Sequence, residues 1–218
     1  MANNAIVTLT DPRSIAAEAY RTLRTNIEFS SVDEPVQTLL ATSAAPTDNK
    51  SVTVANLAVV LADGDRPVIL VDADLRRPSQ HTLFGLTNEQ GFSSLFRDAD
   101  AFANPPFQTV PNTSLRVLTS GPLPPIPSQL LASKKMDDVI KHLASLADIV
   151  IFDAPPIITV NDASLLASRV DGVLLIVRAG DTKRDHVKAA KDRIEKVNAR
   201  LIGAVLTNAQ VDTALEYS

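Results

Sequence analysis

Short apolar runs alternate along this chain with longer segments of helical pattern, and several of the runs are apolar at every position. Such runs are typical of strands that are buried on both faces of a parallel sheet. The expected strands are residues 38–42, 68–71, 115–118, 149–152, 172–177 and 201–206. The expected helices are residues 15–29, 51–62, 128–146, 162–168 and 183–197, with Ser128 as an N-cap. This order predicts an α/β fold with a doubly wound, mostly parallel sheet that helices flank.

Composition limits the class of protein. The 218 residues are 45% hydrophobic, so one domain over residues 1–218 is the simplest count, with a tail from about 207 to 218. The absence of Cys excludes disulfides and zinc–thiolate sites, and the net charge of −4 argues against a nucleic-acid partner. No apolar run reaches the roughly 18 residues that span a bilayer, and the first residues do not form a signal peptide. We expect a cytoplasmic protein that can dock onto a membrane partner.

The segment between the first expected strand and the next helix has the layout of a phosphate-binding loop, G-x-x-x-x-G-K-[ST], but contains no glycine. Ala44 and Asn49 stand at the glycine positions, followed by Lys50 and Ser51. Such loops need residues at positive φ, which Asn49 adopts at modest cost and the β-branched Thr47 adopts poorly. Lys50 would neutralise phosphates and Ser51 would ligate Mg²⁺. These eight residues alone fit an ordinary turn with a solvated lysine better.

Carboxylates follow two further strands. Asp72 and Asp74 come at the end of the run 68–71, and Asp153 follows the run 149–152. Two aspartates two residues apart on a strand end face the same way and can hold Mg²⁺ through water or accept a hydroxyl proton. Each feature alone also fits a solvated turn or a helix cap. The three features in order on successive α/β units indicate a Mg²⁺–nucleotide site, or a fold descended from one.

With these motifs the chain resembles the bacterial protein tyrosine kinases of capsule and exopolysaccharide assembly (BY-kinases), from Asp11 to about Gln210. The similar segments are Asp11–Ser14, Glu18–Asn26, Thr42–Pro46, Asn56–Ala58, Val71–Pro78, Gly121–Pro125, Asp153–Pro156 and Asp171-Gly172. The related ParA and MinD ATPases carry a signature lysine where this chain has Ala45. The resemblance implies a P-loop NTPase fold of Walker A, A′ and B type.

The resemblance also implies a set of site residues. It assigns ATP or ADP as the cofactor with Mg²⁺, and it assigns Lys50, Asp72 and Asp74 to catalysis. It assigns Ser51, Asp72 and Asp153 to the metal. The implied cofactor-binding residues are Ala45, Pro46, Thr47, Asp48, Asn49, Lys50, Ser51, Val52 and, near adenine, Asn208.

The same resemblance implies partners. Glu18, Arg21 and Arg24 would join subunits into a homo-oligomeric ring, so that Tyr217 in one tail reaches the next subunit's site as phosphoacceptor. A membrane activator (a polysaccharide co-polymerase) and a tyrosine phosphatase would complete the system. The plain alternative for the three interface residues is an exposed helix with one i,i+3 ion pair that contributes about 0.3 kcal/mol.

The family usually has Pro-Gly-Glu-Gly-Lys-Ser-Thr where this chain has Pro46 to Val52 without glycine. Two hypotheses follow. The first is an ATP- and Mg²⁺-dependent tyrosine autokinase that regulates capsular or exopolysaccharide synthesis and export. The second is a non-catalytic pseudokinase that acts as a regulatory or scaffolding subunit of the same machinery.

Overall fold

The computed structural model describes residues 6–30 and 35–209. The strands in this part of the chain form one sheet in the order β3-β4-β2-β5-β1-β6-β7, and every neighbouring pair except β3–β4 is parallel. Their bounds are β1 Thr38–Ser43, β2 Val68–Asp72, β3 Gln108–Thr109, β4 Leu115–Leu118, β5 Ile149–Asp153, β6 Gly172–Arg178 and β7 Leu201–Thr207. The predicted α/β fold class with a mostly parallel sheet is confirmed.

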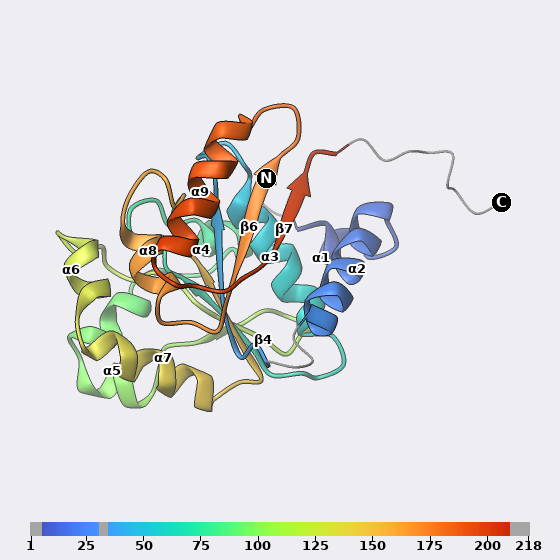
Figure 1. Ribbon diagram of the computed structural model, residues 1–218. Helices are drawn as coiled ribbons and strands as arrows, with labels where there is room; N and C mark the ends of the chain where they lie inside the picture. Colours follow the sequence, from blue (N-terminus) through green and yellow to red (C-terminus); the bar gives the residue numbers. More distant parts are fainter. Residues whose placement is uncertain (1–5, 31–34, 210–218) are drawn as a thin grey trace.

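Helices cover both faces of the sheet (Figure 1). Alternate residues of each central strand point to opposite faces: Leu39 packs with α2 (Ile15–Ser30) and α3 (Lys50–Leu61), whereas Leu40 packs with α7 (Lys135–Ser145), α8 (Asp162–Ala167) and α9 (Arg184–Lys196). The central strands β1, β2 and β5 are buried at every position, which explains why β2 and β5 are apolar up to their final Asp. The helices are α1 Val7–Thr10, α2 Ile15–Ser30, α3 Lys50–Leu61, α4 Gln80–Phe84, η1 Phe92–Phe96, α5 Ala99–Ala103, α6 Pro127–Ala132, α7 Lys135–Ser145, α8 Asp162–Ala167 and α9 Arg184–Lys196.

The expected helix over residues 128–146 is wrong as a single element. It is two helices, α6 and α7, because Ser133 takes an extended conformation with φ −67° and ψ 154°. The N-cap prediction is also wrong: α6 begins at Pro127, whose ring fixes φ for the first helical position, and Ile126 is the N-cap. Ser128 therefore lies inside the first turn.

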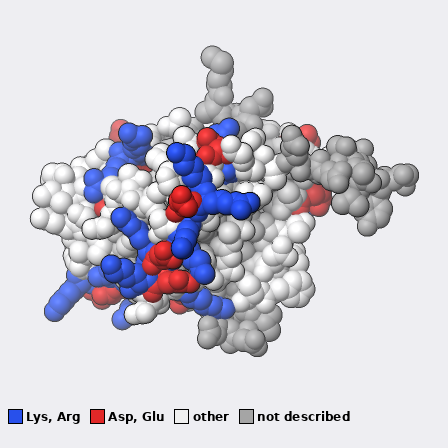
Figure 2. Space-filling model, turned by 45° about the horizontal axis from the view of Figure 1, so that its top comes forward, with Lys and Arg blue, Asp and Glu red and all other residues white. Residues whose placement is uncertain are grey.

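No helix in the described ranges is both long and apolar enough to cross a bilayer. On the face seen in Figure 2, Lys and Arg side chains are interleaved with Asp and Glu side chains. Of the expected tail, Thr207 belongs to β7, and residues 210–218 lie outside the described part of the chain.

Candidate active site at the carboxyl edge of the sheet

The candidate site lies where the central strands end. In the register of the sheet Asp72 on β2 is opposite Asp153 on β5, and Asp153 is opposite Ala41 on β1. Beyond β1 the chain turns through residues 44–49 into α3. The parallel pairing therefore brings both carboxylates and the start of α3 to one edge of the sheet, as the topology of open α/β sheets predicts for a ligand site.

The turn into α3 contains one residue in the left-handed region, Asn49, with φ 54° and ψ 31°. Thr47 does not have positive φ, so the strain expected at this β-branched residue does not arise. The first helical bond runs from the Thr53 amide to the Asn49 carbonyl at 3.1 Å. The amides of the preceding helical residues have no intrahelical partner and are suited to bind an anion.

Lys50 lies at the centre of the site and is buried. Its Nζ contacts Asp153 Oδ1, donates to Ser51 Oγ at 3.1 Å and lies 4.0 Å from Asp74 Oδ2. A pocket of about 250 Å³ opens beside it. Its lining residues are Ser43, Pro46, Asn49, Lys50, Ser51, Val52, Asp74, Arg77 and Pro156.

Asp72 is fully buried and lies in register with Asp153. Its Oδ2 accepts the Ser79 amide at 2.9 Å and the Gln80 amide at 2.8 Å. Its Oδ1 is buried and has no hydrogen-bond partner among the described residues. Burial, reinforced by the charge of Asp153, raises the pKa of Asp72 from 3.8 to about 7. A carboxylate with one unsatisfied buried oxygen is suited to a cation or a proton.

Asp74 has a different environment, because β2 ends at Asp72 and strand alternation does not extend to Asp74. Its Oδ1 accepts the Arg77 amide at 3.0 Å and the Arg76 amide at 3.3 Å, and its side chain lines the pocket. Burial raises the pKa of Asp74, while the positive charge of Lys50 opposes the rise. Asp74 is therefore the better placed of the two to accept a proton from a group in the pocket.

Sequence reasoning missed Gln80, which is fully buried at the start of α4. Its Nε2 donates to Asp153 Oδ2 at 2.7 Å and to the Ser51 carbonyl at 3.0 Å. Gln80 thus links the β5 carboxylate to the start of α3. Arg76, whose role the sequence left open, forms a bidentate pair with the buried Asp162 at 2.7 and 3.1 Å.

The donor set fits a small divalent cation that keeps other ligands. No three acidic, histidine or cysteine side chains in the described ranges form a metal-binding group by themselves. Magnesium usually takes one or two carboxylates with water and phosphate oxygens. The Ser51 hydroxyl and the Asp72 and Asp153 carboxylates supply oxygens of this kind around Lys50.

Three of the predicted loop residues, Ala45, Thr47 and Asp48, do not line the pocket. Ala45 and Asp48 are buried, and the Thr47 carbonyl accepts from Arg178 Nη1 at 3.2 Å. Asn208 is exposed with φ 55°, and its Nδ2 lies 3.5 Å from the Ala179 carbonyl. The end of β7 is beside the loop, but no contact of Asn208 with the pocket is found in the described structure.

The predicted interface residues make contacts within the chain. Arg21 pairs with Glu18 three residues earlier and donates to the Pro12 carbonyl at 2.7 Å. Arg24 donates to the Val60 carbonyl near the end of α3 at 2.9 Å. Their role between subunits stays a prediction. Tyr217, the predicted phosphoacceptor, lies outside the described residues.

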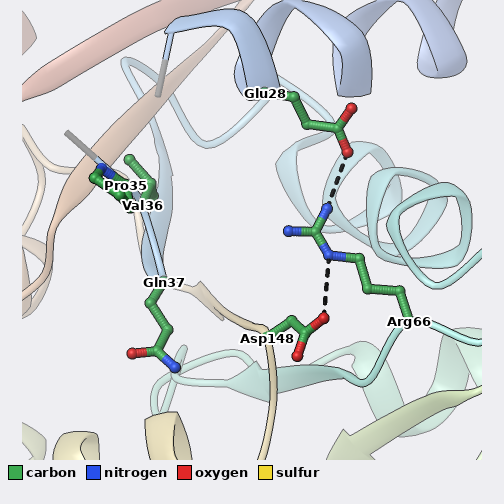
Figure 3. A pocket seen from close by; sticks show the side chains of 6 residues that line it. All are labelled: Glu28, Pro35, Val36, Gln37, Arg66 and Asp148. Atoms are coloured by element: carbon green, nitrogen blue, oxygen red, sulfur yellow. Dashed lines mark hydrogen bonds and ion pairs between the residues drawn. The ribbon is translucent and has the colours of Figure 1, made fainter. Parts of the chain in front are cut away.

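A larger pocket, of about 530 Å³, lies at the opposite edge of the sheet, where the strands begin (Figure 3). Its charged groups pair with one another: Arg66 Nη1 is 2.9 Å from Glu28 Oε1, and Arg66 Nε is 3.8 Å from Asp148 Oδ2. The described residues that line it include no cluster of buried carboxylates. The chemistry therefore belongs to the smaller pocket beside Lys50.

Comparisons with known proteins place the chain among characterised relatives. No protein-family model matches the chain. The chain is 40% identical over 212 residues to tyrosine-protein kinase YwqD of Bacillus subtilis, and the aligned residues cover 97% of this chain and 89% of that protein. It is 32% identical over 209 residues to tyrosine-protein kinase CpsD of Streptococcus agalactiae, and this alignment covers 92% of this chain and 87% of that protein.

Solved structures give the same result. The kinase domain of the Escherichia coli tyrosine kinase ETK superposes with a TM-score of 0.89 at 32% identity, over 98% of this chain and 83% of that chain. The septum site-determining protein MinD of Pyrococcus horikoshii, solved with Mg-ADP, superposes with a TM-score of 0.66 at 18% identity, over 78% and 69%. The second likeness concerns the fold alone.

Proposed function

Because the chain belongs to the family of bacterial tyrosine-protein kinases, we propose that it is an ATP- and Mg²⁺-dependent protein tyrosine autokinase that regulates capsular or exopolysaccharide synthesis and export. One observation carries this proposal. Lys50, Asp74 and Asp153 meet beside one pocket at the start of α3, and the partly unsatisfied carboxylate of Asp72 lies in register with Asp153.

Each residue has a role in this proposal. The amides at the start of α3 and the Lys50 ammonium bind the phosphates. Ser51, Asp72 and Asp153 hold the cation, and Asp74 accepts the proton of the attacking tyrosine hydroxyl. When bound, Mg-ATP would supply the phosphoryl group, and its Mg²⁺ ion would partly neutralise the charge of the phosphates. Lys50 pairs with Asp153 in the described structure, so nucleotide binding exchanges that ion pair for lysine–phosphate and carboxylate–cation contacts.

Calorimetric titration of Mg-ATP and Mg-ADP into the wild type and Lys50→Ala tests the nucleotide site. We expect binding by the wild type and none by the variant, because Lys50 supplies the buried positive charge at the start of α3. A Thr47→Gly/Asn49→Gly variant is the matched comparison. Absence of binding by the wild type, together with its recovery in the glycine variant, would refute a competent site.

That outcome would support the second candidate, a pseudokinase that acts as a regulatory or scaffolding subunit. The glycine-free loop and the ion pair between Lys50 and Asp153 favour it, since the pair must break before either group can serve a ligand. Incubation with ATP and an activating partner, followed by mass spectrometry of Tyr217, separates the candidates. Phosphate on Tyr217 that requires Lys50 supports the kinase.

The proposal includes partners. A homo-oligomeric ring through Glu18, Arg21 and Arg24, a membrane activator and a tyrosine phosphatase would place this cytoplasmic domain at the inner face of the membrane. In this proposal residues 1–218 form one kinase-like domain whose tail, from about 207, carries the acceptor. The exposure of Glu18, whose side chain is 64% accessible, supports the ring. A gel-filtration mass equal to one chain at micromolar concentration and low salt would count against it.

A further inference from the structure

The loop before α3 contains a carboxylate that the proposed mechanism does not use. Asp48 is fully buried, and its side chain does not line the pocket. Its Oδ2 accepts the Ala45 amide at 2.7 Å, and its Oδ1 accepts the Thr182 hydroxyl. A buried carboxylate is strongly destabilising unless it is hydrogen-bonded, so both bonds are needed to keep Asp48 in place.

Thr182 belongs to the connection between β6 and α9. Its hydroxyl accepts the Arg178 amide at 3.2 Å while it donates to Asp48. Arg178 also donates through Nη1 to the Thr47 carbonyl at 3.2 Å. On the neighbouring strand β7, Thr207 Oγ1 donates to the Asp48 carbonyl at 3.3 Å. The loop is thus held by side chains from the ends of β6 and β7.

These contacts occur in a loop that lacks the usual means of forming such a turn. Phosphate loops of the G-x-x-x-x-G-K-[ST] type rely on glycine for their backbone conformation. In this chain Asn49 alone in the loop has positive φ, and no glycine is present between β1 and α3. The conformation is therefore fixed by side-chain hydrogen bonds to the backbone.

We propose that Asp48 and Thr182 are positioning residues that together hold the glycine-free loop in its phosphate-binding shape. We call the Asp48–Thr182 hydrogen bond, with its extension from Asp48 to the Ala45 amide, the loop brace. Its part in nucleotide affinity rests on the proposed function, whereas its part in holding the loop does not. Without the Thr182 hydroxyl, Asp48 Oδ1 is left buried without a donor, and Asp48 leaves the Ala45 amide to reach water.

The chain offers a matched control at the other edge of the sheet. Thr38 is buried, and its hydroxyl donates to Asp171 Oδ2 at 2.8 Å and accepts the Asp171 amide at 2.9 Å. It therefore combines one bond to a carboxylate with one bond from an amide, as Thr182 does. Thr38→Val removes the same kind of hydroxyl far from the loop.

The first measurement is amide hydrogen exchange of the nucleotide-free protein by NMR, on the wild type, Thr182→Val, Thr182→Ser and Thr38→Val. We expect exchange at the Ala45 amide to be about 10-fold or more faster in Thr182→Val, since loss of a bond to a charged group has an effect of that size. Thr182→Ser restores the hydroxyl and the slow exchange, and Thr38→Val leaves the Ala45 rate unchanged. An unchanged Ala45 rate in Thr182→Val would overturn the proposal.

The second measurement is titration of Mg-ADP into the same proteins. The dissociation constant should rise about 10-fold in Thr182→Val, since fewer molecules have a competent loop, and change less than about 2-fold in Thr38→Val. Equal weakening by both valine variants would show a general loss of stability and would also overturn the role in affinity. If the wild type binds no Mg-ADP, the nucleotide proposal fails, and the exchange rates still decide whether the loop brace exists.

Discussion

Replacement of Asp72 by Asn should stabilise the protein at high pH. The carboxylate is fully buried, has one oxygen without a partner in the described structure, and lies in register with Asp153. Asn keeps an oxygen for the amides of Ser79 and Gln80 and removes the buried charge. The variant should at the same time lose affinity for Mg-ADP, because the proposed cation site loses a carboxylate.

The magnitude follows from the pKa of Asp72, which burial and Asp153 raise from 3.8 to about 7. Between these values the native state binds a proton that the unfolded state has released, so the free energy of unfolding falls as pH rises. Since one pKa unit corresponds to about 1.36 kcal/mol, this group removes about 2 to 3 kcal/mol of stability between pH 5 and pH 8. Asp72→Asn has no such loss.

Urea denaturation at several pH values between 5 and 8 measures the difference in free energy of unfolding between Asp72→Asn and the wild type. The difference should grow in favour of the variant by about 2 to 3 kcal/mol across this range. Asp192→Asn, at an exposed position on α9, is the control and should give a constant difference. A difference for Asp72→Asn that is flat with pH, or that grows in favour of the wild type, would refute the argument.

Three further substitutions test other contacts through the free energy of unfolding in urea. Asn49→Ala should lower it by about 1 kcal/mol, because alanine is strained at φ 54°, whereas Asn49→Gly should be nearly neutral. Arg24→Ala should lower it by about 1 kcal/mol through the lost bond to the Val60 carbonyl; no change would mean that α2 does not depend on this contact. Gln80→Leu should lower it by about 1 to 3 kcal/mol and weaken Mg-ADP binding, because Asp153 Oδ2 loses a buried donor; unaltered affinity would remove Gln80 from the site.

The sequence predicts the sheet well, for a physical reason. Strands such as β2 and β5 are buried on both faces, so nearly every position is apolar and the pattern is visible without any alignment. The expected helix over 51–62 is likewise close to α3, Lys50–Leu61. Where conformation depends on one residue, as at Ser133 between α6 and α7, the hydrophobic periodicity gives no signal. The prediction of one helix over 128–146 fails for this reason.

The candidate site is predicted in part. Lys50 and Asp153 were expected together because strand topology alone brings them to one edge, and they are in contact. Gln80 could not be found in this way, and Asp48 is implied only by the family resemblance, since the role of each depends on which distant group it contacts. Gln80 reaches a strand end 73 residues away in sequence, and Asp48 reaches Thr182 across 134 residues.

The helix α3 connects the candidate pocket with the predicted subunit interface. Its first turn forms the floor of the pocket, and the Val60 carbonyl near its last turn accepts from Arg24 of the predicted subunit interface. A helix of 12 residues is a stiff rod about 18 Å long. Midway along it, Asn56 is anchored to Thr8 of α1 by a bond of 3.0 Å. A translation of α3 along its axis would therefore displace its first and last turns together. The distance between the pocket and the predicted subunit interface is set by this one helix.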